Sequence, residues 1–221
     1  MFLWITGGSS DRCPLNRVCS CQNLQGKLFA DCSERHLTKA SPFSEDVIGI
    51  SFEKNNFTVI PKNLPEKLLY LDMSKNLLVS ITQSSLRRYK LLQNFSVSYN
   101  QLTEVTRGTF QWNLQLRELD VSHNMGLTIE VIHNISFDLK SSNIQRLNFE
   151  NLHCTYGLSQ IFKKYHVSNL KHTQLQELNL ASNRIHSLEF GGLSLFPKSL
   201  RVFNIANNVL SYGFYIMGFS S

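Results

Sequence analysis

The chain has 221 residues, of which 17% are charged, and its formal net charge is +6. Lysines and arginines are scattered along the sequence, which favours an ordinary solvated surface over a nucleic-acid-binding stripe. No stretch approaches the roughly 18 apolar residues of a membrane-spanning helix, so we expect none within this chain.

Residues 1–12 precede the first cysteine. Their apolar run, Phe2–Ile5, has no basic residue ahead of it, whereas a signal peptide has about 7–15 apolar residues after a charged start. We therefore expect an unstructured start or the remnant of a signal peptide here. The short run also indicates that the native start lies elsewhere or that the chain is a fragment.

Four of the five cysteines gather in residues 13–46, with the spacing Cys-x5-Cys-x-Cys-x10-Cys. They are Cys13, Cys19, Cys21 and Cys32. Zinc sites commonly use two separated Cys-x2–4-Cys pairs, and the single residue between the middle cysteines is an awkward spacing for one metal ion. A disulfide framework fits better and indicates an oxidising compartment, but four cysteines allow three pairings.

Residues 47–221 repeat one pattern: apolar, two free, apolar, one free, apolar, two free, asparagine, one free, apolar. The stretch 175–185, LQELNLASNRI, is the clearest copy. Seven units begin at Val47, Leu68, Leu92, Leu116, Ile144, Leu175 and Leu200. This is the leucine-rich repeat pattern, whose period is about 20–29 residues. No second cysteine cluster follows the seventh unit, so we expect no C-terminal cap in this chain.

Alternation within each unit predicts one short strand, because every second residue of a strand faces the core. Stacking the units places these strands side by side, about 4.8 Å apart. We therefore predict an α/β leucine-rich repeat solenoid, a horseshoe with short parallel strands on its concave face. Because the end of a solenoid needs a cover, residues 13–46 are expected to form a disulfide-linked N-terminal cap.

An asparagine follows the predicted strand in six of the seven units, where the chain bends inward. An amide offers donors and an acceptor together, so it can satisfy backbone groups that lose water at the bend. The sequence therefore predicts a ladder of buried asparagines: Asn55, Asn76, Asn100, Asn124, Asn183 and Asn208.

The concave face is the candidate binding surface. One residue of each unit lies between two buried strand positions and should point out of this face. The candidates for ligand contact are Asp72, Ser96, Asp120, Asn148, Asn179 and Asn204. This small, polar set suits a protein or glycan partner better than a lipid. The simpler alternative, the solvated side of a sheet, remains open.

Two features concern the longest unit. The spacing of Leu158, Ile161, Phe162 and Tyr165 gives one apolar helical face, so we predict a short outer helix over about 158–166. Cys154, the fifth cysteine, occupies an apolar column, where a buried free thiol behaves as a small hydrophobe.

Three Asn-x-Ser/Thr sequons agree with an exported chain. Their acceptors are Asn56, Asn94 and Asn134. A glycan on Asn94, beside the third repeat strand, would obstruct part of the concave face.

The organisation resembles that of Toll-like receptors over about residues 12–221. Residues 13–43 are similar to the cysteine-rich N-terminal cap of extracellular leucine-rich repeat proteins, and the irregular stretches 147–189 and 196–219 look like the middle of a Toll-like ectodomain. The cap resemblance implies the pairs Cys13–Cys21 and Cys19–Cys32.

The resemblance to the receptors implies the N-terminal part of a longer, single-pass receptor of innate immunity with a cytoplasmic signalling domain. Its ectodomain would bind a protein or glycan ligand, or a second receptor chain, on the extracellular side of the membrane. The alternative is a secreted or cell-surface adhesion or matrix protein without signalling activity.

The motifs of catalysis are not found. There is neither a Gly-x-Ser-x-Gly elbow nor a His-Glu-x-x-His pair, and neither GGSS nor GGLS matches a phosphate loop. We expect no enzyme activity, no cofactor, no metal site and no nucleic-acid partner.

Overall fold

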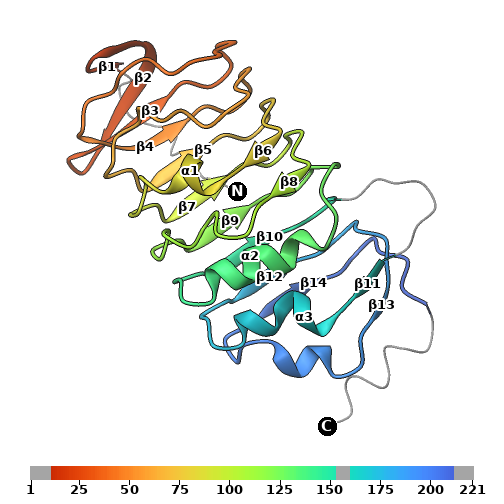
Figure 1. Ribbon diagram of the computed structural model, residues 1–221. Helices are drawn as coiled ribbons and strands as arrows, with labels where there is room; N and C mark the ends of the chain where they lie inside the picture. The colour runs from red at the N-terminus through yellow and green to blue at the C-terminus, as the bar shows by residue number, and fades with distance from the viewer. Residues whose placement is uncertain (1–10, 153–159, 212–221) are drawn as a thin grey trace.

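The computed structural model describes residues 11–152 and 160–211 (Figure 1). The chain winds into a solenoid whose strands form one long sheet, in the order β1-β2-β3-β4-β5-β7-β9-β10-β12-β14. The first three strands pair antiparallel, and every later neighbour pairs parallel. The predicted leucine-rich repeat solenoid is confirmed.

The N-terminal cap is a three-stranded antiparallel unit: β1 (Asp11–Cys13), β2 (Asn16–Leu24) and β3 (Lys27–Asp31). The expectation of an unstructured segment through residue 12 is wrong at its last two residues, because the β2 backbone offers partners for β1. Residues 1–10 lie outside the described part. Strand β3 then pairs parallel with the first repeat strand, so the cap and the repeats share one continuous sheet.

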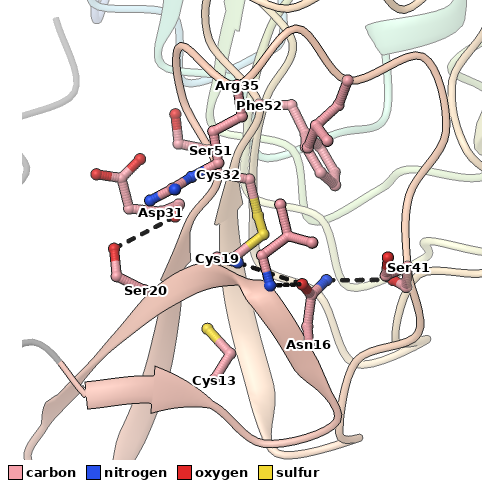
Figure 2. Close-up of a disulfide and its surroundings, with 12 residues drawn as sticks. Cys13, Asn16, Cys19, Ser20, Asp31, Cys32, Arg35, Ser41, Ser51 and Phe52 are labelled. Atoms are coloured by element: carbon pink, nitrogen blue, oxygen red, sulfur yellow. Dashed lines mark hydrogen bonds between the residues drawn. A yellow bond between two sulfur atoms is a disulfide. The ribbon is translucent and has the colours of Figure 1, made fainter.

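Two disulfides hold the cap, Cys13–Cys21 and Cys19–Cys32, as the resemblance implied. Figure 2 shows the second of them beside Asn16, whose side-chain oxygen accepts hydrogen bonds from two backbone N–H groups of β2. The amide of Asn16 also donates to Ser41 O. All four cysteines are buried. The disulfides therefore fill the interior of the cap, as leucines fill the interior of the repeats.

Each of the seven repeats contributes one short strand to the sheet. These strands are β4 (Val47–Ser51), β5 (Tyr70–Asp72), β7 (Asn94–Ser96), β9 (Glu118–Asp120), β10 (Arg146–Asn148), β12 (Glu177–Asn179) and β14 (Val202–Asn204). The middle residue of each three-residue repeat strand, such as Leu71 or Leu119, is buried in the spine, except that Phe203 of β14 is partly buried. Its two neighbours point out of the concave face, because side chains alternate along a strand.

The outer side carries short and varied elements. The helices α1 (Gln83–Leu86), α2 (Val131–Leu139) and α3 (Lys164–Val167) lie on one side of the main sheet (Figure 1). Two 3₁₀ turns, η1 (Ser168–Leu170) and η2 (Gly192–Leu195), follow α3. Two small parallel sheets pair β6 (Ser80–Ile81) with β8 (Glu104–Val105) and β11 (Gln160–Phe162) with β13 (Ile185–Leu188).

The predicted helix over 158–166 is wrong. Residues 160–162 form strand β11, and only Lys164–Val167 is helical. The backbone N–H of Gln160 donates to Arg184 O, and Phe162 O accepts from Glu189 N, so pairing with the next turn satisfies groups that a helix would have satisfied internally. Residues 153–159, including Cys154, lie outside the described part.

Within residues 11–152 and 160–211, no helix is long and apolar enough to cross a membrane.

Candidate functional site

The asparagines after the strands form a hydrogen-bonded ladder, which is interrupted at the fifth repeat, where Leu152 stands in the asparagine position. The amide of Asn100, for example, donates to Val97 O and Ser98 O of its own turn and to Met73 O of the preceding turn. Its side-chain oxygen accepts from Leu78 N of that preceding turn, at 2.9 Å. The same bonds between adjacent turns are made by Asn55, Asn76, Asn124, Asn183 and Asn208. Each of these six asparagines therefore bonds its bend to the preceding turn from inside.

The six candidate ligand residues occupy the last position of each strand. The side-chain oxygen of Asp72 accepts from Ser74 N at 2.8 Å, and that of Asp120 accepts from Ser122 N at 2.9 Å. The same bond to the residue two positions on is made by Asp31, Ser51, Ser96, Asn148, Asn179 and Asn204. These residues therefore hold the bend, and burial raises the pKa of Asp72. Their contact with a ligand remains a prediction.

The position before each buried strand residue forms a second outward column, which the sequence analysis did not single out. It reads Gly49, Tyr70, Asn94, Glu118, Arg146, Glu177 and Val202. Arg146 lies in register between Glu118 and Glu177 on the adjacent strands and forms an ion pair with Glu118. At the cap end, the Phe29 ring covers Gly49, where an added Cβ would meet it at 2.4 Å.

The concave face is acidic on a chain that is basic overall. At the outward strand positions from β3 to β14 that are in register with Gly49 and Ser51, and at the residue two positions further on, it carries seven acids and one base. The acids are Asp31, Glu53, Asp72, Glu118, Asp120, Glu150 and Glu177, and the base is Arg146. The bends beside these positions also hold Lys54 and Lys75, and Lys75 forms an ion pair with Glu53. A hollow of about 310 Å³ spans β7 to β14, and its lining includes Glu118, Asp120 and Glu177. The arrangement suits a cationic group.

A rim of side chains borders this face where each strand bends away. Its members have left-handed backbones with φ between 52° and 61°, and they are Glu34, Lys54, Lys75, Tyr99, His123, Asn151, Ser182 and Asn207. They contact one another between turns. The rings of Tyr99 and His123 stack at 4.0 Å, and Lys75 Nζ lies 5.8 Å from the Tyr99 ring centre. Tyr99 is half exposed, so the rim is available to a partner.

The three sequon asparagines lie in different surroundings. Asn56 is exposed in a bend, and Asn94 is half-buried on β7, in the concave column next to Glu118. Asn134 lies within α2, where its amide donates to Val105 O at 3.3 Å. Asn56 is therefore the most accessible of the three, and glycosylation remains a prediction for all of them.

A buried histidine of α3 lies on the outer side. His166 is fully buried, its Nδ1 accepts from Lys163 N, and its Nε2 lies 3.5 Å from a carboxylate oxygen of Glu130. Burial lowers the pKa of His166, although Glu130 opposes that shift. The same carboxylate accepts a hydrogen bond from the hydroxyl of Tyr165, and burial together with this bond raises the pKa of Tyr165 to about 12.

This histidine gives a pH-dependent stability with a definite sign. Because the folded pKa of His166 lies below its unfolded value of about 6.5, the unfolded chain takes up the proton first, and stability falls as the pH drops through this range. His166→Gln should reduce stability at pH 7.5, and the gap to wild type should narrow at pH 5. The midpoints of urea denaturation at both pH values measure this difference in stability, and His172→Gln, at an exposed position, is the control. If the difference in stability between wild type and His166→Gln is the same at both pH values, the lowered pKa of His166 is contradicted.

Several of these features leave a weak sequence signal. Arg146 and its two glutamates sit at equivalent repeat positions, so comparing the position before each strand leucine would have found the charged column. His166 has no such signal, since its burial depends on how α3 packs against α2. Among the described residues, no cluster of three potential metal ligands occurs.

Residues 66–125 match the leucine-rich repeat family. The chain is 34% identical to Toll-like receptor 4 of Pinctada imbricata over 126 residues, which is 57% of this chain and 14% of that protein. It is 30% identical to Tsukushi-A of Xenopus laevis, over 69% of this chain and 41% of that protein. The solved Toll–Spatzle complex from Drosophila contains a chain that superposes on 72% of this one, with a TM-score of 0.55 and 22% identity, over 21% of its own length.

The fold and the family match together define the class: this is a leucine-rich repeat protein with a disulfide-linked N-terminal cap. Within that class, the resemblance to Toll-like receptors is confirmed: the chain is similar to the leucine-rich repeat region of such receptors. It spans 14% and 41% of the length of these two curated relatives. Neither the family nor these relatives point to a catalytic activity.

Proposed function

We propose that the chain is the ligand-recognition portion of a Toll-like innate immune receptor and that its concave face binds a basic segment of a protein ligand. The observation that carries this proposal is the acidic concave face of a basic chain. Opposite charges across an interface raise the association rate and exclude wrong partners. A protein ligand is also consistent with the Toll–Spatzle complex, whose Toll chain shares this fold.

We place the proposed contact in the hollow of the concave face, whose lining includes Glu118, Arg146 and Glu177. Glu118 is engaged by Arg146, whereas Glu177, in register on the other side of Arg146, is exposed. A lysine or arginine of the ligand can therefore extend the alternation of charge by pairing with Glu177. Because these charges are near solvent, the attraction should weaken at high salt.

Binding of a flexible peptide rich in lysine and arginine tests this proposal. Glu118→Gln with Glu177→Gln should weaken binding about tenfold at low salt, since each surface pair contributes up to about 1 kcal/mol. The control, Glu45→Gln with Glu104→Gln, removes the same charge from exposed positions elsewhere. Equal weakening in both double variants, measured by fluorescence anisotropy, would remove the concave face as the binding surface.

The second candidate is a secreted or cell-surface leucine-rich repeat protein without signalling activity. The similarity to Tsukushi-A, which covers more of this chain than the receptor match does, favours it. Sequencing the full transcript separates the two. A membrane helix followed by a Toll/interleukin-1 receptor domain supports the receptor, and a stop codon without them supports the alternative.

A further inference from the structure

The outer side of the solenoid carries a charge opposite to that of the concave face. Four segments from successive turns, 83–90, 106–115, 131–142 and 163–174, contain eight cations and one acid. The cations are Arg87, Arg88, Lys90, Arg107, Lys140, Lys163, Lys164 and Lys171. We call these eight residues the outer belt; all of them are exposed.

The repeat geometry aligns the belt. In three of the four segments a fully buried leucine is followed at once by a cation: Leu86 by Arg87, Leu139 by Lys140, and Leu170 by Lys171. Because the buried residues occupy equivalent places in stacked turns, the cations after them form a row that follows the solenoid. Such a row matches a linear partner with repeated negative charge.

The acid within these segments does not neutralise the belt. Asp138 is buried, and its two carboxylate oxygens accept hydrogen bonds from Gly108 N and Phe110 N, at 2.8 and 3.0 Å. It holds the neighbouring turn in place. Within the described part of the chain, one of the eight belt residues forms an ion pair: Arg88 binds Glu66. Glu130, just ahead of α2, is bonded to Tyr165 instead.

Aromatic rings position part of the belt. The Arg87 guanidinium lies 5.6 Å from the ring centre of Trp112, which is 43% exposed. The Arg107 guanidinium lies 3.3 Å and the Lys140 ammonium 4.2 Å from the ring centre of Phe137. The two arginine contacts join residues of successive turns, and all three contacts hold the cations in place without cancelling their charge. The exposed edge of Trp112 adds an apolar surface for a sugar ring.

We propose that the outer belt binds a sulfated linear polysaccharide. Its regularly spaced sulfates match a row of cations, and a flexible chain can follow a curved surface that a flat membrane would touch over a shorter length. The buried disulfides place the chain in an oxidising compartment, where such polysaccharides are met more often than nucleic acids. The belt lies on the side opposite the concave face, so the two sites can be occupied together.

Binding to immobilised heparin at physiological ionic strength tests the proposal. Arg87→Ser, Lys140→Ser and Lys171→Ser, combined, should weaken binding about tenfold and lower the salt concentration needed for elution. The matched control, Lys27→Ser, Lys39→Ser and Arg117→Ser, removes the same charge from exposed positions off the belt and should weaken it less than about twofold. Circular dichroism and thermal unfolding check that both triple variants fold.

Three results would overturn the proposal. The first is failure of the wild-type chain to bind heparin at physiological ionic strength, and the second is an equal loss in the belt and control variants. The third is tighter binding of single-stranded DNA or of anionic phospholipid vesicles than of heparin, which would assign the belt to another polyanion. Glu118→Gln with Glu177→Gln on the concave face should leave heparin binding undiminished, so this test is independent of the one for the protein ligand.

Discussion

Asn124→Ala should destabilise the chain by about 3 kcal/mol, because it strips partners from several buried backbone groups at once. Asn124 is fully buried in the middle of the array. Its amide donates to Val97 O, Val121 O and Ser122 O, and its oxygen accepts from Leu102 N. Alanine replaces none of these bonds. Equilibrium urea denaturation measures the loss.

Asn143→Ala is the matched control for this substitution. Asn143 is exposed and its side chain bonds to Gln115 on the surface, so its loss should change stability by less than about 0.5 kcal/mol. Comparable losses from the two alanines would mean that the ladder bonds contribute no more than surface contacts do.

Removing the Cys19–Cys32 disulfide should cost about 2–5 kcal/mol and loosen the first repeats before the later ones. Both cysteines are buried, and Cys32 touches the array directly: its N–H donates to Ser51 O and its carbonyl accepts from the amide of Asn55. Cys19→Ala with Cys32→Ala should therefore speed hydrogen exchange in β3 and β4 first. Exchange in β10 and β12 should change little.

The other disulfide provides the comparison. Cys13–Cys21 closes a shorter loop and joins β1 to β2, farther from the first repeat. Cys13→Ala with Cys21→Ala should therefore destabilise less and confine faster exchange to β1 and β2. Uniform loss of protection along the whole solenoid from either double variant would show that the turns unfold as one unit, against nearest-neighbour coupling.

The array could be predicted from the sequence because its signals are local and repeated. Leu71, Leu119 and Leu178 mark strand centres in the sequence and in the structure alike. The cysteine pairing rested on resemblance, since spacing alone allowed three arrangements. Periodicity read within one unit was less reliable: Phe162 fits a helical face, yet the backbone of β13, in the next turn, drew it into a strand.

The outer elements depend on contacts between turns, which explains why prediction was weaker there. Helix α2 was not predicted, although Val131, Ile132, Ile135 and Leu139, all of which are buried, have helical spacing. The burial of His166 against α2 had no signal within its own unit. On the concave face, the polar character was predictable, but the pairing of Glu118 with Arg146 required the register of adjacent strands.

The rim has a consequence for how this protein can evolve. Left-handed backbone costs a residue with a side chain roughly 1 kcal/mol or more. At six of the eight rim positions the next residue is a ladder asparagine bonded to the adjacent turn, as Asn100 is after Tyr99, and these bonds stabilise the bend. Glutamate, lysine, tyrosine and histidine all accept that conformation along the rim. The cost depends on the backbone and little on the side chain, so selection can exchange these residues one turn at a time. The side chains that a partner would contact can therefore change during evolution while the fold stays the same.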